Sequence, residues 1–344
     1  MTDSQWIKLL DIIEGREITP LPTGFIVDSP WLPNWFGIKI LDYFTNDELW
    51  LKANLHAVTS FPDVMFLPGF WSEFGMCSEP SAFGAKCTFP ANEFPHAHKI
   101  IHSIEEISGI SKPNPEKDGF APFILNRLLI NRQKIEDNGH KIFFSVSRGP
   151  LNIASYLMGT TEFLTGMITH PEEIHKLIHT ITEYLIELND LQMQAIPTID
   201  GILILDDIIG FIGEEEFKEF GLPYFKKLFD RNVSVKFLHN DASHLSSISY
   251  LNEMGVNLFN MGFETDLNEL KLITDNRVTM MGNIPPRDVL ARGSLREIEK
   301  EVEALIKNLN ERSKVIVSCG GGMSPDVSTE NIQCFVETVM KYSQ

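Results

Sequence analysis

The feature that most constrains this chain is a repeated alternation of short β-branched runs with longer helical patterns, which begins near residue 140. Such alternation is typical of successive βα units around a parallel sheet. Two earlier runs bring the number of predicted strands to eight. The predicted strands are 24–27, 63–67, 141–146, 201–205, 235–238, 258–261, 278–281 and 314–318. Eight parallel strands favour a sheet that closes on itself.

The segments between these strands carry helix signals. Apolar residues within 6–13 fall on one helical stripe, which predicts a helix in front of the first strand. Ser294 with Glu297, and Thr169 with Glu172, have the spacing of a capping box ahead of later helices. The predicted fold is therefore of the α/β class, a TIM (β/α)₈ barrel with an N-terminal helical extension.

Composition limits the kinds of partner and the compartment. The chain has 344 residues and a formal net charge of −18, which disfavours nucleic acid and anionic membranes as partners. No segment approaches the ~20 apolar residues that span a bilayer. Four cysteines without CxxC spacing indicate neither a disulfide framework nor a zinc ribbon, so we expect a cytoplasmic protein. No linker is visible, and residues 1–344 are expected to form a single domain.

In a barrel of this kind, side chains converge on an open mouth where the strands end and the βα loops begin. Polar, aromatic and metal-capable residues follow most of the predicted strands, and we expect them to share one site. The predicted catalytic groups are Asp206, Asp207 and His239, and the predicted substrate-binding groups are Asp28, Trp31, Arg148, Glu264 and Asn283.

Three ordered motifs in the last third of the chain resemble the uroporphyrinogen decarboxylase superfamily. They read LHNDASHLSSISYLNEMGVNLFNMGFETDLNELK, RVTMMGNIPPRDVLARGSLREIEKEVEALI and SCGGGMSPDVSTENI. Upstream, SRGPLNIASYLMGTTEFLTGMITHPEEIHKLI and ILILDDIIGFIGEEEFKEFGLPYFKKL resemble the same family. The resemblance covers residues 140–344 well and the earlier residues loosely, and it implies an enzyme on a (β/α)₈ barrel.

The segment after the first strand distinguishes two branches of that superfamily. Porphyrin decarboxylases carry an arginine-rich segment there, which grips the carboxylates of the substrate. Here the segment reads IVDSPWLPNWFGI and contains no arginine. Because bidentate arginine pairs are what recognise carboxylates, we expect porphyrinogen to be a poor substrate for this chain. The chain is more similar to the branch of zinc-dependent methyltransferases that exchange methyl groups with a corrinoid protein.

The resemblance to that branch implies a zinc site with His-x-Cys after strand five and a cysteine after strand eight. This chain has His239-Asn240-Asp241 at the first place. At the second place Gly321 stands opposite the family cysteine, and Cys319 lies two residues earlier. Residues two apart on a strand share a face, and zinc accepts carboxylate oxygen. The predicted metal ligands are therefore His239, Asp241 and Cys319.

Each predicted ligand also has a purely structural interpretation. His239 suits a hydrogen-bonded side chain inside the mouth. Asp241 suits the cap of a helix that begins near Ser243. Cys319 suits a small buried thiol at the end of a strand.

The other candidate residues also have more than one possible role. Asp206 and Asp207 are adjacent at the end of a strand, so one of them is expected to point into the mouth while the other turns away. Arg148 suits either a substrate carboxylate or phosphate, or the neutralisation of one of these two aspartates. Trp31 suits either an aromatic substrate or the ordinary core.

The leading functional hypothesis is methyl transfer between a small methyl ether, alcohol or thiol and a corrinoid protein, with zinc as Lewis acid. The alternative is a metal-free decarboxylase or lyase for a small carboxylated substrate, with Asp206 or Asp207 as acid and base and Arg148 as anchor. A non-catalytic binding protein on the same scaffold is a third class. Beyond its small-molecule substrate we expect a transient corrinoid protein as partner, and the sequence leaves a homodimer open.

Overall fold

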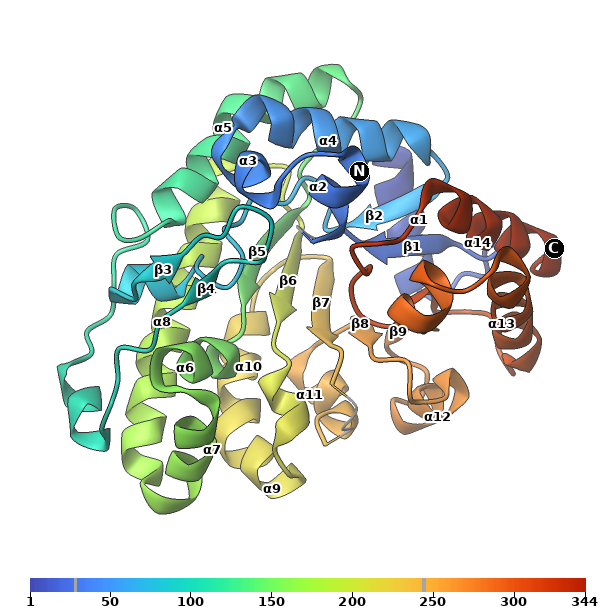
Figure 1. The fold of residues 1–344 in the computed structure, drawn as a ribbon. Helices are drawn as coiled ribbons and strands as arrows, with labels where there is room; N and C mark the ends of the chain where they lie inside the picture. The colour runs from blue at the N-terminus through green and yellow to red at the C-terminus, as the bar shows by residue number, and fades with distance from the viewer. Residues whose placement is uncertain (28–29, 243–245) are drawn as a thin grey trace.

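The fold was examined in a computed structural model that describes residues 1–27, 30–242 and 246–344. Eight parallel strands form one curved sheet in the order β2-β1-β10-β9-β8-β7-β6-β5, and helices surround it (Figure 1). The strands of this sheet are β1 (Thr23–Ile26), β2 (Val64–Leu67), β5 (Phe144–Arg148), β6 (Gly201–Leu205), β7 (Val235–Asn240), β8 (Leu258–Met261), β9 (Thr279–Ile284) and β10 (Val315–Cys319). This arrangement confirms the predicted TIM (β/α)₈ barrel.

The helices follow the strands in the order expected of βα units. They are α1 (Asp3–Ile13), α2 (Trp31–Phe36), α3 (Ile40–Thr45), α4 (Asp47–Ser60), α5 (Ala121–Asp137), α6 (Pro150–Met158), α7 (Thr160–Thr169), α8 (Pro171–Ala195), α9 (Glu214–Glu216), α10 (Leu222–Phe229), α11 (Leu251–Met254), α12 (Leu267–Ile273), α13 (Leu295–Asn308) and α14 (Thr329–Tyr342). Single 3₁₀ turns lie at 80–83, 104–109, 208–211 and 248–250, and π-helical turns at 217–221 and 286–291.

All eight predicted strands are present, and the largest displacement is at β5. We expected this strand at 141–146, whereas it pairs with β6 from Phe144 to Arg148. The backbone N–H of Lys141 donates instead to the carbonyl of Met1, so the first residues of the apolar run contact the N-terminal segment and not the sheet. As a result Arg148 is the last residue of the strand, whereas the prediction placed it two residues after the strand end.

The N-terminal helix α1 closes the barrel at the end opposite the mouth. Phe237, Leu203 and Ile316, on three different strands, belong to one buried cluster with Trp6 of α1. Trp6 also stacks on Phe143, with ring centroids 4.5 Å apart. Because this apolar layer fills the barrel near the start of the strands, the site must lie at their carboxyl ends.

Alternate residues of each strand face the helices instead. Val315 and Val317 of β10, Leu238 of β7 and Ile204 of β6 belong to a second, larger cluster that includes the apolar faces of the helices. Successive side chains of a strand point to opposite faces, so membership of one cluster or the other shows the direction of each strand residue. This alternation decides which strand-end residues reach the mouth.

One of the two predicted capping boxes is present. At α13 the Ser294 hydroxyl accepts from the backbone N–H of Glu297, and the Glu297 carboxylate accepts from the backbone N–H of Ser294. The prediction at Thr169 is wrong, because this residue ends α7 and its hydroxyl donates to the carbonyl of Thr165. Helix α8 begins with Pro171, which has no N–H that would need a cap.

Residues 89–141 contain helix α5, the 3₁₀ segment 104–109 and strand β4 (His96–Ala97). Strand β4 pairs with β3 (Cys87–Thr88) in a two-stranded antiparallel ribbon. Helices α4 and α5 lie together over one side of the barrel in Figure 1. Within the described residues, no helix combines the length and apolarity needed to cross a membrane.

Candidate active site

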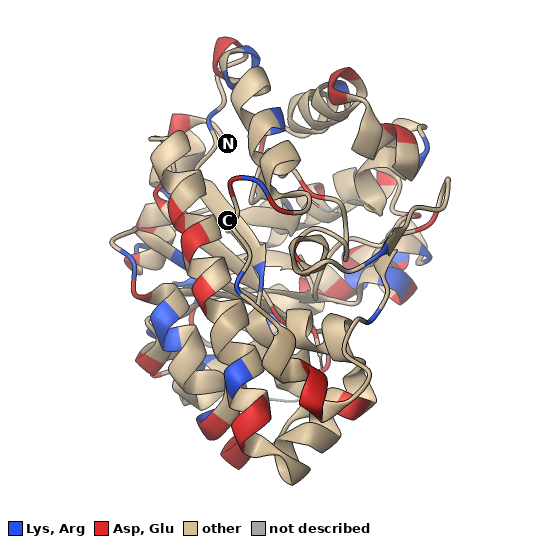
Figure 2. Ribbon diagram, turned by 90° about the vertical axis from the view of Figure 1, so that its left-hand side faces the viewer, with Lys and Arg blue, Asp and Glu red and all other residues tan. Residues whose placement is uncertain are grey.

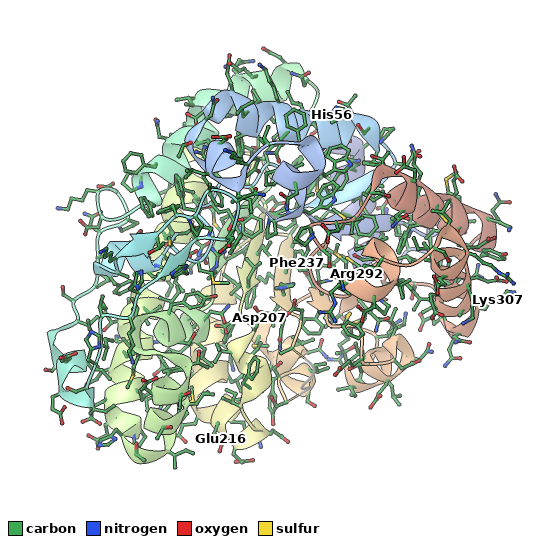
Figure 3. All side chains as sticks on the ribbon, viewed as in Figure 1. His56, Asp207, Glu216, Phe237, Arg292 and Lys307 are labelled. Atoms are coloured by element: carbon green, nitrogen blue, oxygen red, sulfur yellow. The ribbon has the colours of Figure 1, made fainter. Side chains whose placement is uncertain are left out.

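Three ionisable side chains meet at the carboxyl ends of β6 and β7. Asp207 follows β6, His239 lies within β7, and Asp241 follows β7. One potential ligand atom from each of the three lies within 4.8 Å of the others. In Figure 3, Asp207 lies near the centre of the molecule, whereas Lys307 points outward from α13. This cluster matches the position at which a barrel enzyme carries its chemistry.

His239 is oriented by a hydrogen bond from the neighbouring strand. Its Nδ1 lies 2.7 Å from the side-chain oxygen of Asn260 on β8. The amide nitrogen of Asn260 already donates to the carbonyl of Met281, so its oxygen faces the imidazole and must accept from Nδ1–H. A neutral imidazole protonated at Nδ1 has its lone pair on Nε2. This lone pair is directed toward Asp207, whose Oδ1 lies 3.7 Å from Nε2.

The two aspartates are held close together by the chain itself. The backbone N–H of Asp241 donates to Oδ1 of Asp207, with 3.2 Å between the two atoms. Partial burial raises the pKa of Asp207, the nearby His239 opposes this rise, and the Asp241 carboxylate adds to it. The side chain of Asp207 is still 39% exposed, so the cluster can be reached from the mouth.

Gly321, which stands opposite the family cysteine, is in direct contact with Asp241. Its φ is +78°, and a Cβ placed on it would lie 2.7 Å from Oδ2 of Asp241. Glycine is the residue that combines this backbone conformation with so close an approach. The space that a side chain at position 321 would need is therefore taken by the Asp241 carboxylate.

Cys319 does not belong to this cluster. It is the last residue of β10 and alternates with Val315 and Val317, so it packs in the apolar layer between strands and helices. Its thiol contacts the carbonyl of Gly321 at 3.6 Å. Cys319 does not share a face with residue 321 as predicted, because the strand ends at Cys319 and Gly321 adopts a φ of +78°.

Asp206, which was predicted as a catalytic group, lies away from the mouth and binds the start of α6. Its side chain is fully buried, and Oδ2 accepts from the backbone N–H groups of Leu151 at 2.9 Å and Asn152 at 3.2 Å. These N–H groups belong to the first turn of α6, where a carboxylate is favourable. Burial raises the pKa of Asp206 to about 8, against the effect of these backbone donors. As expected of adjacent residues, one aspartate faces the mouth and the other does not.

Arg148 reaches neither a substrate position nor the two aspartates. Its Nη2 lies 2.8 Å from Glu73 and its Nη1 3.4 Å from Glu79, and all three residues are buried. Glu79 also accepts from the backbone N–H of Arg148 at 2.8 Å. The predicted role as a substrate anchor is not supported, because two protein carboxylates already occupy the guanidinium.

The remaining predicted substrate residues differ in placement. Trp31 is fully buried in α2, stacks on Trp35 and donates from Nε1 to the carbonyl of Val327, so it is a core residue. Asp28 lies outside the described residues. Asn283 of β9 donates to the carbonyl groups of Phe263 and Thr265 and so holds the loop after β8.

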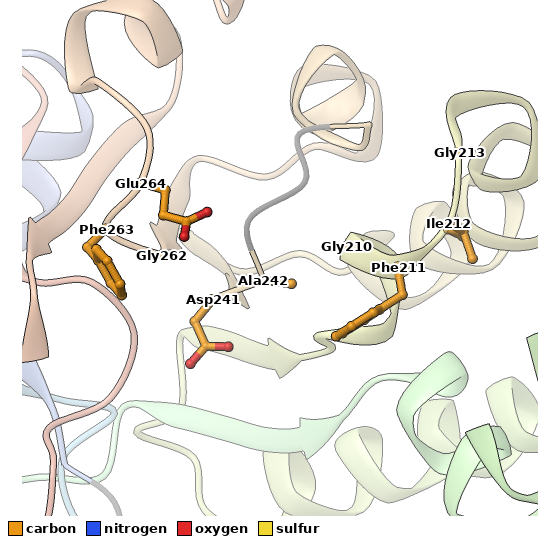
Figure 4. A pocket seen from close by; sticks show the side chains of 9 residues that line it. All are labelled: Gly210, Phe211, Ile212, Gly213, Asp241, Ala242, Gly262, Phe263 and Glu264. Atoms are coloured by element: carbon orange, nitrogen blue, oxygen red, sulfur yellow. The ribbon is translucent and has the colours of Figure 1, made fainter. Parts of the chain in front are cut away.

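That loop borders a cavity of about 560 Å³ next to the cluster. Figure 4 shows the carboxylates of Asp241 and Glu264 and the rings of Phe211 and Phe263 around it. The lining residues are Gly210, Phe211, Ile212, Gly213, Asp241, Ala242, Gly262, Phe263 and Glu264. Glu264 is therefore the predicted substrate-binding residue whose position beside an open cavity best fits that role.

The sequence analysis missed three residues that contact predicted site residues. Asn260 was not singled out, although its place two residues after the start of β8 gives it an inward direction. Glu73 and Glu79 were not singled out either, because no local signal indicates that they meet Arg148, which lies 75 and 69 residues away. Asp207 was predicted as a catalytic acid or base and not as a ligand.

Comparison with known sequences supplies the family. The family described as "Uroporphyrinogen decarboxylase (URO-D)" matches residues 34–342. A protein named uroporphyrinogen decarboxylase from Mannheimia succiniciproducens is 24% identical, with 77% of this chain and 76% of that protein covered. One of the same name from Pseudoalteromonas atlantica is 26% identical, with 85% and 80% covered.

Comparison with solved structures supports the fold. A methyltransferase from Methanosarcina mazei superposes with a TM-score of 0.81 at 19% identity, over 98% of each chain. A B12-independent methionine synthase from Shewanella sp. W3-18-1, in complex with selenomethionine, gives a TM-score of 0.59 at 12% identity. That likeness covers 94% of this chain and 96% of the synthase chain. At such identities the likeness extends to the barrel and not to the chemistry.

Proposed function

The chain belongs to the uroporphyrinogen decarboxylase family, and we propose that within this family it is a metal-dependent methyltransferase. It would move a methyl group between a small substrate, such as a methyl ether, alcohol or thiol, and a corrinoid carried by a separate protein. The observation that carries this proposal is the convergence of Asp207, His239 and Asp241 within 4.8 Å at the mouth. The methyltransferase named among the structural neighbours is consistent with it.

The chemistry of this donor set fits a divalent cation. Nε2 of His239 offers a lone pair, because Nδ1 is the protonated nitrogen, and the two carboxylates offer further lone pairs. Three such atoms repel one another unless protons or a cation lie between them. No lysine or arginine of the described residues forms an ion pair with Asp207 or Asp241. One imidazole and two carboxylates are acceptable zinc ligands, and three protein ligands leave one position open.

Each residue then has a defined task. Asp207, His239 and Asp241 would hold the ion, and Asn260 keeps Nε2 of His239 directed at it. When bound, such an ion supplies Lewis-acid polarisation of a substrate heteroatom. A set with two carboxylates is harder than one with two thiolates, and this favours an oxygen over a sulfur heteroatom. We therefore favour a methyl ether or an alcohol as substrate.

The curated relatives are named as decarboxylases, and two observations oppose that activity here. The segment after β1 has no arginine, and Arg148 at the end of β5 is neutralised by Glu73 and Glu79. The accessible charges at the mouth, Asp207 and Asp241, would repel a polycarboxylate. The alternative function is a metal-free lyase for a small carboxylated substrate, and experiment must distinguish it from the methyltransferase.

The corrinoid needs a second protein. Apolar side chains fill the barrel below the mouth, so a ring as wide as a corrin has to be presented from outside. Reaction at a methyl carbon requires reacting atoms about 3–3.5 Å apart and in line. The partner would therefore dock over the carboxyl ends of β6, β7 and β8, and it must leave again after transfer, which favours a transient contact.

The test combines metal analysis with a methyl-transfer assay. Purified protein is analysed for zinc, then mixed with corrinoid proteins of its host in which cobalt is reduced to the +1 state. Cobalt absorbance is followed while methoxylated aromatics, simple alcohols and thiols are screened. We expect zinc near one equivalent per chain and methylation of cobalt, and no coproporphyrinogen from uroporphyrinogen. Release of carbon dioxide from a carboxylated substrate without any cobalt methylation would replace methyl transfer by the lyase.

A further inference from the structure

The cavity beside Asp241 combines a negative lining with exposed aromatic rings. Among the described residues that line it, Asp241 and Glu264 carry carboxylates, and none of these described residues is lysine, arginine or histidine. Phe211 is 62% exposed and Phe263 is 46% exposed, so a ligand in the cavity can reach both rings. Both rings border the same cavity, one from the loop after β6 and the other from the loop after β8.

Close packing of the loops keeps these groups around the cavity. A Cβ on Gly262 would lie 2.6 Å from the backbone carbonyl oxygen of Asp241, so glycine allows the loops after β7 and β8 to meet. Asn283 then ties the β8 loop to β9 through its bonds to Phe263 and Thr265. The carboxylate of Glu264 therefore projects from a braced loop, and Figure 4 shows it directed toward the cavity.

The charges of the two sites do not cancel. A divalent ion held by Asp207, His239 and Asp241 would be balanced by the two aspartate carboxylates. The Glu264 carboxylate would remain, and no ion pair of Glu264 is found among the described residues. A negative group at a cavity that also exposes aromatic faces attracts an organic cation, because the face of an aromatic ring carries partial negative charge. An anionic ligand would be repelled by the Glu264 carboxylate, which is exposed at the edge of the cavity.

We propose that this cavity binds a small substituted ammonium group, which serves as the cationic part of the substrate. The inference rests on the proposed function only where it identifies the bound molecule as the substrate of the neighbouring metal site. Glu264 supplies the counter-charge, and Phe211 and Phe263 supply the ring faces. The substrate class is thereby narrowed to small molecules that carry both a methyl-bearing or hydroxyl oxygen and an ammonium group.

The test uses the full chain and a probe that needs no chemistry. Tetramethylammonium and the uncharged tert-butanol are titrated calorimetrically at constant ionic strength, with and without zinc. We expect saturable binding of tetramethylammonium and binding of tert-butanol at least about tenfold weaker. Glu264→Gln should weaken tetramethylammonium binding about tenfold, and Phe211→Leu and Phe263→Leu about threefold each. Equal binding of the two probes would overturn the inference.

Matched controls remove the same groups elsewhere. Glu269→Gln removes a carboxylate from the exposed side of α12, and Phe123→Leu removes a ring of 63% exposure on α5. Neither residue lines the cavity, so both variants should bind tetramethylammonium like the wild type. A loss of affinity in Glu269→Gln as large as in Glu264→Gln would mean that binding reflects overall charge, and would overturn the proposed site.

Failure of this inference can be told apart from failure of the proposed function. Methylation of cobalt from uncharged ethers without tetramethylammonium binding would reject the cation cavity and leave methyl transfer standing. The opposite outcome is specific tetramethylammonium binding that is lost in Glu264→Gln, together with no methylation of cobalt by any substrate tested. That outcome would support the cation cavity and reject methyl transfer.

Discussion

The ion cluster at the end of β5 and the cluster at the ends of β6 and β7 differ in where their counter-charge comes from. Arg148 is enclosed by Glu73 and Glu79, so this group of charges is neutralised within the protein and buried. Asp207, His239 and Asp241 converge without an internal cation and remain open to the mouth. Both groups occupy strand ends of one barrel.

This difference teaches that ionisable residues at a catalytic rim do not by themselves mark a site. What distinguishes the second cluster is that its charge and lone pairs are left for something outside the protein to satisfy. Figure 2 shows aspartate and glutamate residues distributed over the helices together with lysine and arginine residues, so an acidic residue alone does not mark a site. The comparison can be tested by removing the internal counter-charge of one cluster and supplying an external one to the other.

The largest effect on stability is expected at the buried cluster of Arg148, Glu73 and Glu79. Arg148→Met leaves two buried glutamates without their cation, and the loss of one partner of a buried ion pair costs about 3–5 kcal/mol. Urea denaturation should report this loss in the free energy of unfolding. Arg292→Met, at an exposed position, should change the free energy by less than about 0.5 kcal/mol. Equal stability of the two variants would show that the Arg148 cluster is not structural.

The cluster of Asp207, His239 and Asp241 should instead make the stability of the protein depend on metal. Zinc at one hundred times its dissociation constant should stabilise the wild type by about 2.7 kcal/mol. His239→Ala should lose this stabilisation and the enzymatic activity, while its metal-free stability falls by only about 1 kcal/mol, the contribution of the bond to Asn260. Thermal unfolding with and without zinc measures both quantities. If His239→Ala is far less stable than the wild type without zinc, His239 has a structural role like that of Arg148.

A smaller effect should follow from the residue that orients His239. Asn260→Leu removes the acceptor for Nδ1–H, and loss of such a partner typically weakens metal binding 10- to 100-fold. Asn260→Asp retains an acceptor and should recover most of the affinity. Competition titration with a chromophoric zinc chelator measures the dissociation constants. Identical constants for the leucine and aspartate variants would argue that the hydrogen bond has no role in metal binding.

The smallest effect is a pH dependence away from both clusters. Burial, and then the positive charge of the chain terminus, lower the pKa of His140 to about 4. The unfolded chain takes up this proton below about 6.5, so between these values the unfolded state holds more protons. The stabilisation that neutral His140 contributes to the free energy of unfolding is therefore complete above pH 6.5, and it is lost as the pH falls toward 4.

His140→Gln should reduce the slope of the unfolding free energy against pH between pH 4 and 6.5, and the reduction should correspond to less than one bound proton. His179→Gln, at an exposed position of α8, should leave the profile of the wild type unchanged. Denaturation midpoints between pH 4 and 7 provide the measurement. A profile of His140→Gln that runs parallel to the wild type would assign the slope to other groups.

The barrel and the region of its site were determined by the sequence alone, because both depend on local patterns. Eight apolar runs of strand length, separated by helical periodicity, require a parallel sheet covered by helices, and residues that follow the runs collect at one end. Asp207, His239, Asp241 and Glu264 could be placed at the mouth in this way. The family motifs after residue 140 led to the same barrel.

Only the tertiary structure decided what each of these residues does. Cys319 alternates with Val315 and Val317 and therefore faces the helices, which places it outside the cluster at the mouth. The choice between Asp206 and Asp207 depended on where the first turn of α6 lies, since its N–H groups bind one of the two carboxylates. Partners distant in the chain neutralised Arg148. Side-chain direction and the balance of charge arise from long-range packing, which local periodicity does not encode.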